Sequence, residues 1–222
     1  MTDAHCHVSC GDPAVRELLV GRDFFGVHPW ETIDGTTGTC AELLASLRVR
    51  LLANPGAGVG KIGLDRLKCR DISPRMREVF EAQLALALEL GRPVVLHGAK
   101  CWGQVVAAIR RQMALSLRPV SSFLFHGFSR SDGLIPDIVK LNGYISVGPA
   151  VLNDHAVNYR ELVGKIPLDR LLVKTDAVAG ARVPACPHIR DVLAKTAEIV
   201  GVSMSELEKA TDENADRFIA AV

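Results

Sequence analysis

The sequence has no run of apolar residues that approaches the roughly 20 needed to cross a membrane. Its first residues lack the charged and then apolar segments of a secretory signal. The chain also lacks an excess of one charge, since 26 Lys and Arg face 25 Asp and Glu. A net charge of +1 gives the chain as a whole no nucleic-acid footprint, although the charge inside a cleft can differ from the total.

Paired cysteine motifs are absent as well. The six cysteines are scattered, with no C-x-x-C pair: Cys6, Cys10, Cys40, Cys69, Cys101 and Cys186. In a chain of this length, isolated cysteines are typical of reduced thiols rather than of a disulfide framework. Together with the lack of a signal, this pattern predicts a cytoplasmic location.

No linker rich in Gly, Ser or Pro and no low-complexity tract divides the chain. Aromatic residues are few, at 5%, but 48% of residues are hydrophobic, so the 222 residues can bury a substantial core. We therefore predict a single domain over residues 1–222.

Short β-rich apolar runs recur along the chain. They lie at residues 24–27, 58–62, 93–96, 122–125, 144–147 and 171–173. Each run is continuous rather than alternating, which is typical of a parallel sheet covered on both faces. With residues 1–4 as another short strand the count is seven, and no eighth strand can be identified.

Helical patterns separate these runs. Residues 74–90 have apolar positions at helical spacing, with Ser73 as N-cap, Pro74 in the first turn and Gly91 past the end. Residues 101–117 and 132–141 show the same pattern. Near the end, Ser203 and Glu206 suggest a capping box, followed by helices at 206–210 and 214–221. The β-α alternation predicts an α/β domain, which a barrel or a doubly wound sheet would satisfy.

The histidines are placed at strand ends. Five of the seven follow a predicted strand, and an aspartate follows the last one: His5, His7, His28, His97, His126 and Asp176. The carboxyl ends of parallel strands form one face, where sites are built. His5 and His7 lie two residues apart, so on an extended segment both imidazoles point to the same side.

Histidine and aspartate together suit Zn²⁺, Mn²⁺ or Fe²⁺. Such a metal would lower the pKa of a bound water toward ~7, and Asp176 beside that water could accept its proton. We interpret Asp3 and Asp65 as turn or helix-cap residues. His155 and His188 lie away from strand ends and are interpreted as structural.

Seven short motifs occur in order: DAHCH at residues 3–7, GVHPW at 26–30, GKIGLD at 60–65, RPVVLH at 92–97, FHGFS at 125–129, TDA at 175–177 and ENADRF at 213–218. In these motifs the chain resembles the TatD family of metal-dependent hydrolases. The resemblance implies an α/β fold of the (β/α) TIM-barrel type, hydrolysis of phosphodiesters, often in DNA, and one or two divalent cations, Zn, Mn or Mg. By position, it implies metal ligands at His5, His7, His97, His126 and Asp176.

The chain departs from the family motifs at charged positions. Lys61 replaces the glutamate that bridges two metals, Lys174 replaces the glutamate of Glu-Thr-Asp, and Gly98-Ala99-Lys100 follows His97 in place of Ser-Arg. An ammonium cannot bind a metal and would repel a metal pair by several kcal/mol. Carboxylation of Lys61 by CO₂ would restore a bridging anion. Alternatively, Lys61 and Lys174 could bind a phosphate as point charges.

The leading hypothesis is a metal-dependent phosphoesterase, with 3′–5′ exonuclease activity as a candidate, acting on single-stranded DNA or a small phosphoester. The candidate catalytic residues are Asp176 and Lys61, and the candidate substrate-binding residues are His28, Lys100, Arg130 and Lys174. Two alternatives remain open. An amidohydrolase-type enzyme or lactonase would have an apolar channel without a basic rim, and a non-catalytic scaffold would hold no metal.

Overall fold

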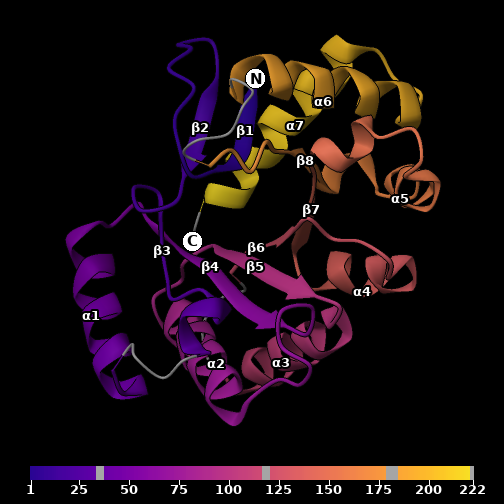
Figure 1. Cartoon of the computed structure of the whole chain (residues 1–222). Coiled ribbons are helices and arrows are strands. Elements are labelled where there is room, and N and C mark those ends of the chain that lie inside the picture. Colours follow the sequence, from indigo (N-terminus) through magenta and orange to yellow (C-terminus); the bar gives the residue numbers. More distant parts are fainter. Residues whose placement is uncertain (34–37, 117–120, 179–184, 221–222) are drawn as a thin grey trace.

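In the described part of the chain, eight short strands follow one another around the molecule in chain order (Figure 1). The computed structural model describes residues 1–33, 38–116, 121–178 and 185–220, with only the backbone given for 185–187. The strands are β1 Thr2–Cys6, β2 Arg16–Leu19, β3 Phe24–Phe25, β4 Gly58–Asp65, β5 Val94–Ala99, β6 Phe123–His126, β7 Gly143–Val147 and β8 Leu171–Val173. Every ladder among them is parallel, as the continuous apolar runs predict.

The strand that the sequence did not reveal is β2. It is four residues long, and its Arg16 and Glu17 interrupt any apolar run. Glu17 is nevertheless buried, because its carboxylate accepts hydrogen bonds from the Cys10 N–H and the Ser9 hydroxyl. A satisfied buried carboxylate can therefore occupy a position that hydrophobic patterning assigns to solvent.

The strands form two ladders, β1-β2 and β3 to β8. A parallel bridge between Val20 and Phe24 connects the ladders on one side. On the other side, two backbone bonds join β1 to the segment after β8: the Asp176 N–H donates to the His5 carbonyl at 3.0 Å, and the His7 N–H donates to the Ala177 carbonyl at 2.8 Å. The start and end of the chain thus meet at the carboxyl ends of the strands.

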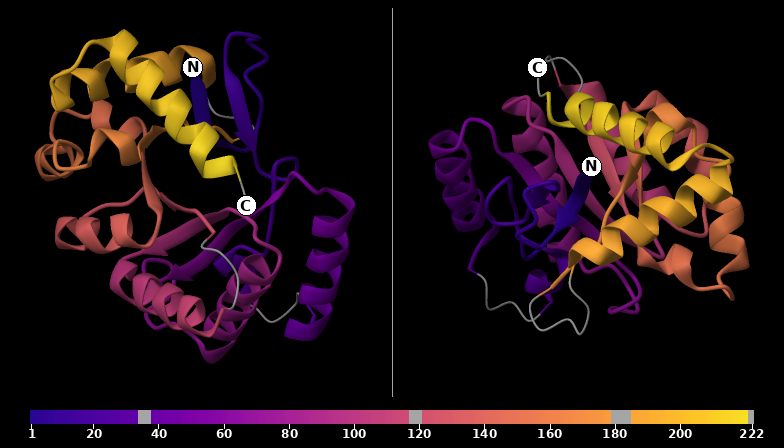
Figure 2. Two further views of the ribbon diagram at one scale, coloured as in Figure 1. Left: turned by 180° about the vertical axis from the view of Figure 1, so that it is seen from behind. Right: turned by 90° about the horizontal axis from the view of Figure 1, so that it is seen from above.

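One side chain from every strand except β4 contributes to a common apolar cluster with the C-terminal helix. Its buried members are Ala4, Leu18, Phe24, Val95, Leu124, Tyr144, Leu172, Ala215 and Phe218. Side chains from so many strands can meet only on the inner face of a curved sheet. The Phe218 carbonyl accepts a hydrogen bond from the Ser122 hydroxyl, just before β6, so the helix end closes the amino end of the barrel. Figure 2 shows this helix crossing the strands.

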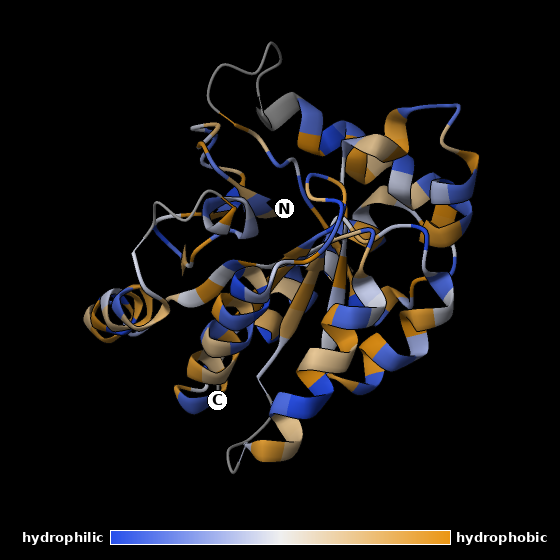
Figure 3. Ribbon diagram, turned by 60° about the horizontal axis from the view of Figure 1, so that its bottom comes forward, coloured by the Kyte–Doolittle hydropathy of each residue, from blue (hydrophilic) through white to orange (hydrophobic). Residues whose placement is uncertain are grey.

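Seven helices accompany the strands: α1 Cys40–Ala53, α2 Pro74–Glu89, α3 Trp102–Leu115, α4 Ile135–Lys140, α5 Val157–Val163, α6 Ala185–Val200 and α7 Met204–Ile219. Short 3₁₀ turns are η1 Pro29–Thr32, η2 Asp132–Leu134, η3 Pro149–Leu152 and η4 Leu168–Arg170. In Figure 3 the helices carry both hydrophilic and hydrophobic residues, as amphipathic helices on a sheet should.

Several helix predictions are confirmed and others need correction. Ser73 caps α2, since its hydroxyl accepts from the Met76 N–H, and Ser203 caps α7 in the same way. The two helices predicted after Ser203 form one continuous helix, and the one predicted at 132–141 divides into η2 and α4. Residues 117 and 221, which end two predicted helices, lie outside the described residues.

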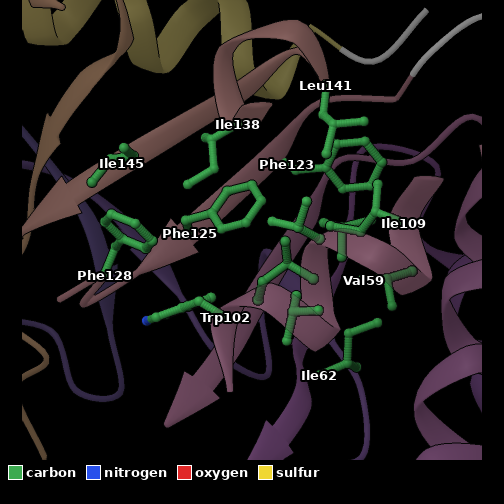
Figure 4. Packing of buried hydrophobic residues seen from close by; sticks show 14 of the residues in the cluster. Val59, Ile62, Trp102, Ile109, Phe123, Phe125, Phe128, Ile138, Leu141 and Ile145 are labelled. Carbon is green, nitrogen blue, oxygen red and sulfur yellow. The ribbon is translucent and has the colours of Figure 1, made fainter. Parts of the chain in front are cut away.

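A second, larger core lies between the outer face of the sheet and the helices (Figure 4). The Trp102 ring of α3 packs against Phe125 of β6 and Phe128 after it, with centroids 5.5 and 5.4 Å apart. A Cβ at Gly98 would collide with the Trp102 ring, so only glycine lets the helix pack this closely on β5.

The cysteine prediction is wrong for one residue. Cys6, Cys40, Cys69 and Cys101 are free thiols, but Cys10 is disulfide-bonded. The Cys186 side chain lies outside the described residues. Across the described part of the chain, no helix has both the length and the apolar composition of a membrane span.

Candidate metal centre

Every second side chain of a strand lies on the same face of the sheet, so the polar side chains of the site follow the apolar residues of the inner cluster along each strand. On β6, Leu124 belongs to that cluster, and His126 lies two residues further along the same face. On β8, Leu172 is likewise followed by Lys174. The inner face of the barrel is therefore apolar in its middle and becomes polar at its carboxyl end, where the sequence predicts the site.

Three predicted ligands meet there. His5, His126 and Asp176 each offer a ligand atom, and these atoms lie within 4.8 Å of one another. The Nε2 atoms of His126 and His5 lie 3.3 and 3.5 Å from the Asp176 carboxylate oxygens. His7 lies at the edge of the group, with its Nε2 3.7 Å from Asp176 Oδ1.

Several of these atoms are buried without a hydrogen-bond partner among the described residues. They include both ring nitrogens of His5 and Asp176 Oδ1. An unsatisfied buried polar group costs about 1–3 kcal/mol, so such a set calls for an explanation. Two imidazoles and a carboxylate with free lone pairs are a ligand set for a divalent cation, and the residues present fit one such ion.

The protonation states suit this role. Burial holds the pKa of His5 and of His126 well below the ordinary histidine value, and nearby positive charge lowers both further, so each ring keeps a lone pair. Burial alone would raise the pKa of Asp176. The nearby His126 and His7 rings and the charge of Lys174 outweigh this effect, so the pKa of Asp176 lies far below its ordinary value and the side chain is a carboxylate.

Two lysines share the same carboxylate. The Lys174 ammonium lies 3.3 Å from Asp176 Oδ2, and the Lys61 ammonium lies 3.9 Å from Oδ1 and 3.5 Å from His126 Nε2. Burial lowers the pKa of both lysines, and the Asp176 charge opposes that shift. The Lys61 ammonium thus occupies a position next to two of the ligands, where its positive charge opposes a second cation.

His97 is the predicted ligand that does not join this group. Its Nε2 lies 2.8 Å from Asp65 Oδ2, which also accepts the Trp30 indole N–H at 2.6 Å. Asp65 Oδ1 accepts the backbone N–H of Leu67 and Lys68, so the interpretation as a capping residue describes only half of its contacts. Burial favours a higher pKa for Asp65, but these hydrogen bonds hold the pKa below its ordinary value.

Asp3 has a positioning role that the sequence did not reveal. It is buried, and it accepts hydrogen bonds from the N–H and the hydroxyl of Thr175 and from the His5 N–H. Burial raises the pKa of Asp3 to about 6 although these bonds lower it. The residue thereby fixes the end of β1, which carries His5, to the segment that carries Asp176.

The four candidate substrate-binding residues lie in different places. His28 caps η1 and packs edge-on against the His97 ring, with centroids 4.8 Å apart. Burial, aided by the charges of His97 and Lys61, lowers the pKa of His28 to about 3. Lys100 is exposed after β5. Arg130 and Lys174 line a cavity of about 960 Å³ beside the metal centre, together with His155, which the sequence gave no reason to select.

A parallel α/β barrel with a histidine–carboxylate centre at the carboxyl end of its strands defines a class of metal-dependent enzymes. Residues 21–220 match the model of the family described as TatD related DNase, so the chain belongs to that family. The family resemblance seen in the sequence is thus confirmed.

Individual relatives agree with this assignment. The chain is 29% identical over 213 residues to the metal-dependent hydrolase YabD of Bacillus subtilis (strain 168). This alignment covers 91% of this chain and 80% of that protein. It is 28% identical over 153 residues to the 3′-5′ ssDNA/RNA exonuclease TatD of Edwardsiella piscicida. This alignment covers 68% of this chain and 56% of that protein. The crystal structure of the TatD homolog YJJV of Escherichia coli K12 superposes on this structure with a TM-score of 0.74 at 24% identity. The superposition covers 94% of this chain and 78% of that chain. That superposition confirms the predicted barrel fold.

Proposed function

We propose that this protein is a metal-dependent phosphodiesterase that hydrolyses single-stranded nucleic acid from an end, using one divalent cation, Zn, Mn or Mg. The observation that carries the proposal is the buried ligand set of His5, His126 and Asp176, with His7 at its edge. Membership in a family described by DNase activity and similarity to a protein named as an exonuclease support the choice of substrate.

The bound cation would supply Lewis acidity at the carboxyl end of the barrel. Asp176 stays ionised because its pKa is strongly depressed, so it is a weak base. Its role is to hold a ligand position and to orient the attacking water by accepting a hydrogen bond from it. His97, held by Asp65, lies near enough to Lys61 to be affected by its charge, and it adds a polar ring to the surroundings of the site.

In a two-metal site, the second metal helps to neutralise the charge of the phosphate. In this protein, Lys61 and Lys174 would do so instead. An ammonium is a compact point charge that binds phosphate oxygens without fixed geometry. The ammonium groups of the buried Lys174 and the partly buried Lys61 both face the carboxylate of Asp176, which leaves positive charge for an anionic substrate. A neutral lactone or amide would leave that charge unbalanced, so the arrangement favours phosphodiesters over carbonyl substrates.

The test is hydrolysis of a labelled single-stranded DNA oligonucleotide by metal-free protein to which Mn²⁺, Zn²⁺ or Mg²⁺ is restored. We expect a chelator to remove the activity and each suitable metal to return it. Asp176→Asn should lower the rate at least ~100-fold, since it removes a charge from the ligand set. The matched control is Asp169→Asn, an exposed aspartate in η4, which should not alter the rate. Activity that survives both chelation and Asp176→Asn would contradict the proposal.

A further inference from the structure

The cavity beside the metal centre is not used by the chemistry described so far. It lies between the loop after β6, the turn η3, the helix α5 and the end of β8, and its volume is about 960 Å³. Ligand pockets in proteins usually have volumes of roughly 300–1,000 Å³. The cavity is therefore large enough for more than a phosphate group.

Lys174 connects this cavity to the metal centre. Its side chain is buried and lies along two glycines: a Cβ at Gly148 would lie 3.1 Å from Lys174 Cε and 3.2 Å from Nζ, and a Cβ at Gly127 would lie 3.9 Å from Cε. The glycines leave a slot that the lysine fills. Its ammonium lines the cavity and lies 3.3 Å from Asp176 Oδ2, so an anion in the cavity would meet a charge that also faces the metal centre.

The rim of the cavity supplies a second positive charge. Arg130 lines the cavity, is exposed, and has no ion pair within the described part of the chain. Lys165 also lies on the rim, but its ammonium is bound to Asp132 at 2.6 Å and adds little net charge. Glu161 adds a second carboxylate to the lining, near Lys165. Arg130 at the rim and the buried Lys174 are therefore the cations that remain to bind an anion.

The remaining lining suits a nucleoside. The Tyr159 hydroxyl accepts the Gly148 N–H at 3.3 Å, so its own O–H remains able to donate into the cavity. Apolar surface in the lining comes from Pro149, Ala150, Val157 and Leu162. An apolar wall with a few convergent polar groups is the usual composition of a small-molecule site.

We propose that this cavity binds a nucleoside monophosphate unit, with its phosphate on Lys174 and Arg130 and its nucleoside against the apolar wall. The inference rests on the proposed function, because such a unit would be the terminal nucleotide of a cleaved strand. It adds to that function a separate site that would hold the terminal nucleotide while the strand is cut. The cavity, rather than the metal centre, would then determine where the strand is cut.

The experiment measures binding of thymidine 5′-monophosphate to metal-free protein by calorimetry, with thymidine and inorganic phosphate as partial ligands. We expect the nucleotide to bind at least tenfold more tightly than either part. Arg130→Ala should weaken nucleotide binding about tenfold, whereas Arg111→Ala, which removes an exposed arginine of α3 that does not line the cavity, should not. Gly148→Ala, which presses on the Lys174 ammonium, should also weaken binding, and its fold can be checked by circular dichroism.

Failure of this inference and failure of the proposed function give different results. If the nucleotide binds no better than phosphate, or if Arg130→Ala and Arg111→Ala behave alike, the cavity is not a nucleotide site, even if DNA is hydrolysed. If the nucleotide binds as expected but metal-loaded protein hydrolyses no DNA, the cavity assignment stands and the proposed phosphodiesterase function does not.

Discussion

We predict that Lys61 limits how many metals the centre can hold. Its ammonium lies 3.5 Å from His126 Nε2 and 3.9 Å from Asp176 Oδ1, beside two of the predicted ligands. We predict that the wild-type protein binds at most one divalent cation per chain and that Lys61→Glu binds two. The variant replaces a repelling charge by two ligand oxygens and should also raise the rate of DNA hydrolysis.

The size of the effect follows from the charges. Two unit charges of like sign about 4 Å apart repel by about 4 kcal/mol at an effective dielectric constant of about 20, and a doubly charged ion doubles this to about 8 kcal/mol. Because ~1.4 kcal/mol is a factor of ten in affinity, even half of the larger figure weakens a second metal about a thousandfold. A second site with an unperturbed dissociation constant of about 1 μM would therefore be empty at micromolar metal.

The assay is metal counting by elemental analysis and native mass spectrometry, with and without bicarbonate. Lys61→Met is the matched control, because it removes the charge without adding a ligand. It should hold one metal, more tightly than wild type, but not two. If Lys61 is carboxylated instead, bicarbonate should raise both metal content and activity, and Lys61→Ala should abolish activity.

The contradicting result is specific. Two metals per chain in bicarbonate-free wild type, with Lys61 unmodified in the electron density, would show that neither the repulsion nor the carbamate governs occupancy. An unchanged metal count in a folded Lys61→Glu variant would likewise show that the lost carboxylate does not limit the site.

Three further predictions test the ligands and the barrel. Replacing His5 and His7 together with Ala should abolish stoichiometric metal, whereas His155→Ala should not; unchanged metal in the folded double variant would refute the ligand assignment. Phe218→Ala should lower the free energy of unfolding by about 3–5 kcal/mol in urea titrations, because Phe218 is fully buried inside the barrel, and Leu115→Ala on the exposed face of α3 should change it by less than about 0.5 kcal/mol. Asn214→Ala should cost about 1–3 kcal/mol in the same assay, since its buried amide donates to the Leu168 and Leu171 carbonyls at 2.8 and 2.7 Å; a neutral result would show that these bonds do not hold α7 in place.

The fold could be predicted where apolar patterning was regular. Among the eight strands of the described residues, continuous apolar runs located six, β3 to β8, and the separately predicted segment 1–4 corresponds to β1. Patterning could not find β2, because Glu17 there is buried with its own hydrogen-bond partners. The same patterning predicted two helices where α7 is one. The local pattern does not show that the polar residues Thr211 and Asn214 are buried within that helix.

The sequence was sufficient to predict which residues come together at the site. The carboxyl ends of parallel strands lie on one face, and the strand ends can be located from the sequence alone. The orientation of each side chain could not. His97 was predicted as a ligand, but the ladder aligns Asp65 of β4 with Ala99 of β5, which brings that carboxylate within reach of the imidazole. Asp3 was missed because its partner Thr175 is 172 residues away in the chain.

Charge is what separates this centre from the motifs of its family. Each replacement of a glutamate by a lysine, at Lys61 and at Lys174, changes the formal charge by two units in the same direction. Asp176 is then the shared partner of both ammonium groups as well as of His5 and His126. One carboxylate cannot neutralise a dication and two lysines together, so the substrate itself has to supply negative charge. A phosphodiester does so at the point of cleavage, and for this reason the lysines strengthen the case for an anionic substrate while they weaken the case for a second metal.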